Sequence, residues 1–494
     1  MRKIILSCIL IVVPIVIHAQ SIFEAIRAND LEKIREMVEK NPQLVNKRGP
    51  NNYTPILFAA NNDKIDIVEY LLSKGANIDD VFTDYYGYTP LIYAIQKGNL
   101  DMVRMLVKRG ANIQYRTKLG ENYLHFAAAY NRVKIASTLI NCGICIDSTK
   151  KGGLTPLHIS ALFGNPDMAK LLAKKGANLD VRSKDGGTAL HYAIAARHDD
   201  VAAFLRREGA KDKARKFPLY RGQYLGRKEP GTVPKLFLPE LFLEIYRTYS
   251  APAFSPDGKE VFWMGYIMPG VQGERIWWMR EKNGRWTPPE VAPFSRFRSS
   301  SPAFSHDGKK LFFAAWGPVD GKIPRDSDLW VVEKRGNGWG EPRHLGFPPN
   351  KKGVYETYPI PARDGTIYFN AFGGGTRNTG TGMYKSKYAN GTYTEKLSLD
   401  GLFDADILDD CSVMDYMIFH TPHRTRSYGS QLFVCFHQSD GIWTRPIYLG
   451  DLFHQGLASN FGKISPNDKY FFFLQDIALY WVDATIIEEL RPKE

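Results

Sequence analysis

Carboxylate side chains are the residues of this sequence best suited to chemistry. Asp404, Asp406, Asp409 and Asp410 lie close together, and Glu356 precedes them by about fifty residues. Two facing carboxylates can hydrolyse a glycosidic bond, and carboxylate oxygens are also the ligands that calcium prefers. Carboxylates in such places far more often cap turns and hairpins, and we favour this simpler interpretation. Glu356, Asp404 and Asp406 are kept as candidate site residues.

Histidines and cysteines also occur at ligand-like spacing. His420-Thr-Pro-His423 could supply two metal ligands, but two histidines alone do not complete a site. Cys142-Gly-Ile-Cys145 has the spacing of a redox or metal motif, but no second pair accompanies it, and whether the two thiols form a disulfide is left open. We therefore expect no metal ion.

Linear catalytic motifs are missing from the sequence. It contains no GxSxG nucleophile elbow, no HExxH, no P-loop and no dinucleotide-binding fingerprint after a strand. We expect no catalytic residue and no cofactor, and an enzyme is the less favoured interpretation.

The elements that would position any site begin with a period of 33 residues in the first half of the chain. Five blocks start at residues 53, 88, 121, 154 and 187, and three of them open with Thr-Pro, as at Thr155-Pro156. Each block continues into a second apolar helix, and most end in glycine, a pattern typical of paired helices with a left-handed cap.

These blocks closely resemble the ankyrin repeat, and the resemblance covers residues 21–215. A more polar copy at residues 21–50 and a charged last copy would serve as caps, which gives six repeats. The resemblance implies helix pairs joined by projecting loops that bind protein partners. His125, His158 and His191 follow the capping residue by three positions, so we expect them to tie neighbouring turns together.

Two blocks depart from the pattern. The loop at residues 81–88 is two residues longer than the others and is rich in tyrosine, which favours recognition surfaces. We expect a partner site there, formed by Asp84, Tyr85, Tyr86 and Tyr88. In the block at residue 121, Glu121-Asn122 stands in place of Thr-Pro and should loosen the start of that helix.

The second half of the chain alternates between two kinds of β-hairpin. One has a Ser-Pro-Asp-Gly turn, as at residues 255–258, and the other an Asn-Gly or Asp-Gly turn followed by an aromatic residue. Those aromatic residues lie 50 to 54 positions apart, at residues 286, 339, 393 and 443. Four short strands in each period of this length are typical of a propeller blade.

The Ser-Pro-Asp-Gly motif with this spacing resembles the TolB-like, WD-like β-propeller family of bacterial envelopes. Five motif units are present, so we expect five blades rather than six in residues 233–494. A spare strand near Leu236 would complete the last blade and leave no exposed edge. Residues 216–232 are predicted to be a linker.

The N-terminus and the charge bear on the compartment and the partners. Residues 1–19 have the layout of a secretory signal peptide, with cleavage expected after Ala19, and no later segment is long enough to span a membrane. The formal charge of +13 is spread along the chain, with its tightest cluster between Lys211 and Lys216. We expect no nucleic-acid site, while an anionic polysaccharide remains a possible ligand.

Together these features predict an exported protein, periplasmic or secreted, with an all-α solenoid followed by an all-β propeller. The function that we expect is non-catalytic binding of a protein partner through the ankyrin surface or a propeller face. The alternative is a carbohydrate-active or glycan-binding protein that uses Glu356, Asp404 and Asp406 in the propeller channel.

Overall fold

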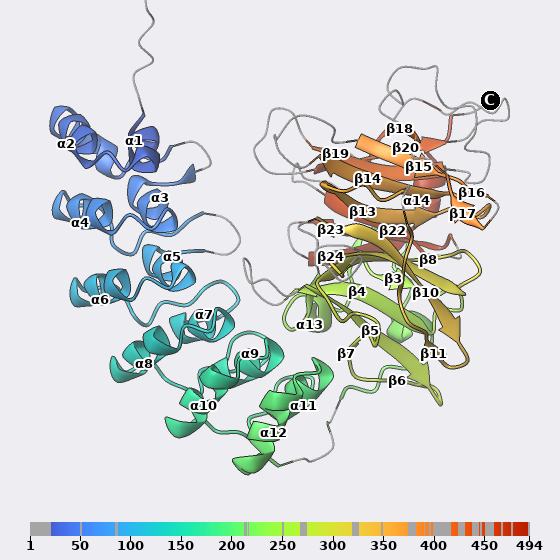
Figure 1. Cartoon of the computed structure of the whole chain (residues 1–494), viewed down its shortest axis with the longest axis horizontal. Coiled ribbons are helices and arrows are strands. Elements are labelled where there is room, and N and C mark those ends of the chain that lie inside the picture. The colour runs from blue at the N-terminus through green and yellow to red at the C-terminus, as the bar shows by residue number, and fades with distance from the viewer. Residues whose placement is uncertain are drawn as a thin grey trace, which may run out of the picture. The chain divides into compact units, whose positions relative to one another are not determined.

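The computed structural model describes residues 21–49, 52–83, 87–211, 215, 217–248, 251–266, 274–318, 326–346, 349–373, 382–389, 391–394, 397–398, 416–422, 430–436, 444, 447–449, 459–465, 468–475 and 478–492 (Figure 1). The contacts divide the chain into two compact units, Met1–Asn112 and Ile113–Glu494. The two units are described separately.

The first unit consists of consecutive helix pairs. Each second helix presents one apolar stripe to the core, as with Met102, Val103 and Leu106 in α6. Pro90 starts α5 and Thr89 caps it by accepting a hydrogen bond from the Ile92 N–H. The helices are α1 (Ile22–Ala28), α2 (Leu31–Lys40), α3 (Pro55–Asn61), α4 (Ile65–Ser73), α5 (Pro90–Lys97) and α6 (Leu100–Lys108), with a short 3₁₀ turn, η1 (Pro42–Val45).

The second unit opens with three more helix pairs, so the described chain up to residue 211 contains six. They are α7 (Tyr123–Ala129), α8 (Val133–Asn141), α9 (Pro156–Leu162), α10 (Pro166–Lys174), α11 (Ala189–Ala195) and α12 (Asp199–Arg207). The expected loosening at Glu121-Asn122 is wrong. Asn122 caps α7 by accepting from the Leu124 and His125 N–H groups, because asparagine is as good an N-cap as threonine.

The strands of the second unit form antiparallel sheets in chain order. Four sheets have at least four strands, one has three and one has two. In the order of the chain these are β2 (Arg247–Thr248), β3 (Ala253–Phe254), β4 (Glu260–Tyr266), β5 (Arg275–Lys282), β6 (Arg285–Trp286) and β7 (Glu290–Val291); β8 (Ser299–Phe304), β9 (Lys310–Ala315), β10 (Asp328–Arg335), β11 (Gly338–Trp339) and β12 (Arg343–His344); β13 (Val354–Pro361), β14 (Ile367–Gly373), β15 (Gly382–Ser386) and β18 (Leu397–Ser398); the pair β16 (Tyr388–Ala389) and β17 (Thr392–Tyr393); β19 (Tyr416–Pro422), β20 (Ser430–Phe436) and β21 (Ile447–Tyr448); and β22 (Ser459–Ile464), β23 (Tyr470–Gln475) and β24 (Ala478–Asp483) with β1 (Lys235–Leu236).

These sheets have a propeller-like arrangement. The predicted count of five blades is not supported as it stands, because only four sheets of the described chain reach four strands. The pair of β16 and β17 forms a two-stranded sheet apart from the sheet of β13, β14, β15 and β18. The sheet of β19 to β21 has only three strands.

The turns follow the sequence motifs. Ser255 accepts hydrogen bonds from the Lys259 and Glu260 N–H groups, Asp257 also accepts from the Lys259 N–H, and Gly258 has a φ of +63°. In the second kind of hairpin, Lys282 pairs with Arg285 across Asn283-Gly284, and both turn residues have positive φ. This is the geometry that Asn-Gly favours.

The predicted strand near Leu236 closes the last sheet. Lys235 pairs with Trp481 and Leu236 with Tyr480, so β1 lies beside β24 although some 240 residues separate them. Phe237, next to β1, is 1% exposed and packs on Phe254 and Trp481. The closure is therefore both a strand pairing and an aromatic core, and the prediction is confirmed.

Truncating this aromatic contact should weaken the closure. Phe237→Ala is expected to lower the free energy of unfolding by about 3 kcal/mol, because it leaves a cavity among buried rings. Denaturant unfolding followed by tryptophan fluorescence measures it, since all nine tryptophans lie at or after Trp263. Leu236→Ala is the matched control, because Leu236 is 47% exposed. Equal losses for the two variants would contradict the packing described.

The predicted linker contains residues that pack on the sheets. Tyr224 and Leu225, in the turn η3 (Gln223–Gly226), are buried, and the Tyr224 ring lies against Phe254 and Tyr470. The Trp286 indole N–H donates to the Gly222 carbonyl at 2.8 Å. The described part of residues 217–226 thus belongs to the packed β region.

Candidate interaction surfaces

Projecting loops join the helix pairs, and we call them fingers. In the second unit the three fingers are residues 116–121, 149–154 and 182–187. Each is closed by a backbone hydrogen bond, as from Lys150 N–H to Leu154 C=O at 3.0 Å. Each is also joined to the next, since Lys151 N–H donates to Leu119 C=O at 2.7 Å and Lys184 N–H donates to Gly152 C=O at 2.9 Å. The fingers therefore form one ordered edge.

The repeated histidines hold this edge in place, as expected. His158 accepts hydrogen bonds at Nδ1 from Thr155 and donates from Nε2 to the Gly187 carbonyl of the next finger, at 3.3 Å. His125 makes the same contact with the Leu154 carbonyl at 3.0 Å. Burial lowers the pKa of both histidines to about 4, although the carbonyls act in the opposite direction. The rings are neutral at pH 7 and structural.

A buried ion pair connects two fingers to the β region. Lys150 and Glu121 have 1% and 5% of their side chains exposed, with 3.6 Å between the ammonium nitrogen and the carboxylate oxygen. The Lys150 ammonium group also donates to the Glu244 carbonyl at 3.1 Å, just after α13 (Pro239–Phe242). The other blocks have Tyr, Leu or Gly at this point of the repeat, and the ion pair explains why this block has Glu121.

A second buried pair lies one finger further on. Asp185 accepts hydrogen bonds from Ser183, from the Tyr192 hydroxyl and from the Arg215 guanidinium. Arg215 in turn donates to the Tyr246 hydroxyl at 3.1 Å. Burial alone would raise the pKa of Asp185, but Arg215 and the hydrogen bonds outweigh it and hold that pKa below its usual value.

These two pairs show that the fingers bind a polypeptide segment of the same chain. Glu244 is held through its backbone carbonyl and its carboxylate, and Tyr246 is held through its hydroxyl. A Cβ on Gly152 would come within 2.9 Å of Ile245, so the contact also needs a glycine there. This contact was not predicted from the sequence, in which its only signals are Glu121 in place of an uncharged residue and the pair Gly152-Gly153.

The predicted partner loop of the first unit is described in part. Tyr88 is 7% exposed and packs against the Tyr93 ring at 5.4 Å, so it belongs to the interior of the repeat. Asp84, Tyr85 and Tyr86 lie outside the described residues. A partner site at this loop stays a prediction. In such a site Tyr88 would anchor the loop to the interior of the repeat and would not itself contact the partner.

The first strands of three sheets meet near a common centre. β8 contacts β13, and the Lys463 ammonium group on β22 donates to the Pro302 carbonyl on β8. Each of these strands is irregular at the same place, and Ser301 and Tyr358 there have φ near +55°. Burial lowers the pKa of Lys463 to about 7. Non-glycine residues in this conformation are often found where a strand re-aims its side chains.

Glu356 lies on β13 and is fully buried. Its backbone N–H donates to the Ser327 carbonyl at 2.8 Å, and the Ser327 hydroxyl donates to the Glu356 carbonyl at 3.0 Å. Asp404 and Asp406 lie outside the described residues, so the carboxylate pair that a glycosidase needs stays a prediction. His423 also lies outside them.

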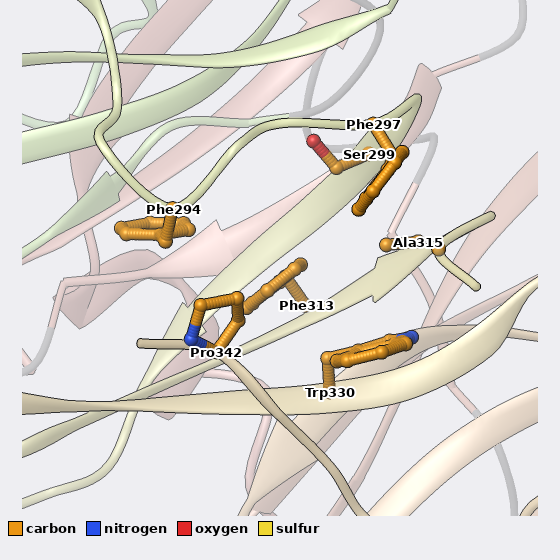
Figure 2. Close-up of a pocket in the computed structure, with 8 residues that line it drawn as sticks. Phe294, Phe297, Ser299, Phe313, Ala315, Trp330 and Pro342 are labelled. Atoms are coloured by element: carbon orange, nitrogen blue, oxygen red, sulfur yellow. The ribbon is translucent and has the colours of Figure 1, made fainter. Parts of the chain in front are cut away.

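A small apolar hollow opens where β8 begins and β9 ends (Figure 2). Phe294, Phe297, Phe313, Trp330 and Pro342 line it. The space inside it that the centre of a water-sized sphere can reach is only about 20 Å³, which is room for about one water molecule. The hollow is therefore too small to hold a cofactor.

The two cysteines of the motif at residues 142–145 are exposed and not joined. Cys142 is the C-cap of α8. No group of three potential metal ligands is found in the part of the chain that the structure describes.

The helix pairs with linked fingers define a repeat protein that presents a long edge. A family model described as ankyrin repeats (3 copies) matches residues 22–117 and 124–216. The chain therefore contains ankyrin repeats, followed by β-rich residues with a propeller-like sheet arrangement. Among the described residues, no helix is long and apolar enough to cross a bilayer.

Proposed function

We propose that this is a non-catalytic interaction protein that binds a protein partner through its ankyrin fingers. The observation that carries the proposal is the finger edge itself. Backbone hydrogen bonds and buried histidines hold it rigid, and it already binds a polypeptide segment at residues 244–246. A preorganised edge loses little entropy when a second segment binds.

We further propose a TolB-like propeller of five blades in residues 233–494. The three-stranded sheet of β19 to β21 contacts β22 and follows the sheet of β13 in the chain, so it has the place of a blade. We also propose that residues 1–19 direct export, which would place the protein in the periplasm or outside the cell. The ankyrin repeats and the sheets support neither the blade count and propeller family nor the export signal by themselves, so both are proposals.

Affinity capture tests the proposed function. The full chain, immobilised, is expected to retain a defined protein at near-equal molar amounts from an extract of the cells that make it. Tyr85→Ser with Tyr86→Ser should lower the retained amount at least about tenfold if the long finger contributes a hot spot. Tyr388→Ser is the control, because Tyr388 is an exposed tyrosine of the β region.

Two outcomes would count against the proposal. Retention of no protein by the full chain would contradict partner binding. Cleavage of a polysaccharide by the wild type, abolished by Glu356→Gln, would favour the carbohydrate-active alternative instead.

A further inference from the structure

Positive charge is concentrated in one stretch of the repeats. Residues 113–216 contain 18 Lys and Arg against 9 Asp and Glu, whereas residues 21–112 contain 12 of each. Nine of the thirteen excess charges of the chain therefore lie in the stretch that contains α7 to α12 and the few residues after α12. A surface of this charge attracts acidic partners and repels basic ones.

Three of these charges stand in a row on the finger tips. Lys118, Lys151 and Lys184 are exposed and lie 33 residues apart, so each has the same place in its repeat. The backbone bonds between tips, from Lys151 to Leu119 and from Lys184 to Gly152, fix the three positions relative to one another. The row is a feature of the folded edge and not of one loop.

Two arginines hold the finger tips in place through hydrogen bonds to backbone carbonyls. Arg116 donates to the carbonyls of Gly120 in its own finger and Thr149 in the next one. Arg182 donates to the Gly186 carbonyl at 2.6 Å. These bonds keep the tips in place, so little ordering is needed when a ligand binds.

One of the finger-tip lysines already binds a carboxylate of the same chain. The Lys184 ammonium group lies 2.8 Å from a carboxylate oxygen of Glu244, and both side chains are still partly exposed. An extended segment laid along the tips would meet one lysine per repeat. Packed helices lie about 8–10 Å apart and an extended chain advances about 3.3 Å per residue, so a carboxylate at every third position matches the row.

We propose that the finger tips carrying Lys118 and Lys151, beside the tip whose Lys184 already binds Glu244, bind an acidic, extended segment of the protein partner, with carboxylates about three residues apart. The inference rests on the proposed function, because it names the chemistry of the partner and the place where it binds. Lys184 and Glu244 show the same contact within the chain.

A peptide titration tests the tips directly. The probe is a labelled synthetic peptide with glutamate at every third position, and fluorescence anisotropy measures its binding to the full chain. Lys118→Glu with Lys151→Glu should weaken binding at least about tenfold, and salt should weaken wild-type binding. Lys170→Glu with Lys174→Glu is the matched control, because it makes the same charge change on exposed positions of α10.

The proposal predicts that the control variant binds within about twofold of the wild type, and that the same peptide with glutamine in place of glutamate does not bind. Equal weakening in both variants would overturn it, because net charge alone would then explain binding. Tighter binding of heparin than of the peptide, lost equally in both variants, would also overturn it in favour of a polysaccharide.

The two proposals can fail separately. If the captured partner is retained equally by the wild type and by the Lys118→Glu, Lys151→Glu variant, the tip surface is refuted while partner binding stands. If no protein is captured, partner binding is refuted whatever the peptide titration shows.

Discussion

Arg215→Met is expected to lower the free energy of unfolding by about 3–5 kcal/mol. The guanidinium is almost completely buried and is the cation that neutralises Asp185, itself 3% exposed. Removing it leaves a buried carboxylate without its counter-charge, which is the costly way to break a buried pair. The same change also removes the hydrogen bond to the Tyr246 hydroxyl and the contact of the guanidinium with the Tyr192 ring.

Urea unfolding followed by circular dichroism measures this loss. The matched control is Lys170→Met, which breaks the exposed pair with Asp167 and should cost less than about 1 kcal/mol. The Asp185 carboxyl should also titrate at higher pH in the Arg215→Met variant, since the group that lowers its pKa is gone. A loss below 1 kcal/mol would mean that the contact between the fingers and residues 244–246 contributes little to stability.

Acid is expected to destabilise the repeats well before the carboxylates titrate. His125 and His158 have a pKa of about 4 in the folded protein, against about 6.5 in the unfolded chain. Between these values only the unfolded chain binds protons at these two positions, so stability falls as the pH falls from 6.5 to 4. The loss reaches roughly 3 kcal/mol for each histidine at the lower end.

Urea unfolding at pH 7.5, 6.0 and 4.5 measures this dependence. His158→Gln is less stable at pH 7.5 but should lose less further stability on acidification than the wild type. His306→Gln is the control, because it removes an exposed histidine. Asp185 contributes in the same direction only below its usual pKa, so the two effects occupy different pH ranges. An unchanged slope in His158→Gln would contradict the structural role of the ring.

The repeat architecture could be predicted from the sequence because its signals are local. A capping residue followed by proline, a histidine three positions after the cap and a terminal glycine each act within one turn of helix. The same holds for the Asn283-Gly284 hairpin, whose turn type depends on two residues. The strand near Leu236 was predictable for another reason, because a final sheet without an outer strand needs one from elsewhere.

The contact between the fingers and residues 244–246 could not be predicted, since it depends on side chains about 30 to 120 residues apart. Lys150 is one lysine among many in the sequence, and only the fold shows that it is buried beside Glu121. The charge excess of residues 113–216 was also missed, because it becomes meaningful only when the repeats align Lys118, Lys151 and Lys184 on one edge.

The expectation that the helix start at Asn122 is loose was wrong, because Asn122 caps the helix as well as threonine would. The expectation rested on the loss of Thr-Pro, but proline only preorganises the first turn, whereas the cap satisfies its free N–H groups. Asn122 supplies the cap with two hydrogen bonds. A substitution at this position therefore has to be judged by its hydrogen bonds rather than by its likeness to the repeat pattern.

Hydrogen–deuterium exchange of the full chain, with and without the captured partner, shows which part of the protein the partner covers. If the fingers are the binding edge, the partner should slow exchange of amides in residues 81–88, 116–121 and 149–154 and leave the first strands β8, β13 and β22 unchanged. Slower exchange confined to those first strands, with the fingers unchanged, would contradict the account and place the binding site at the centre of the sheets.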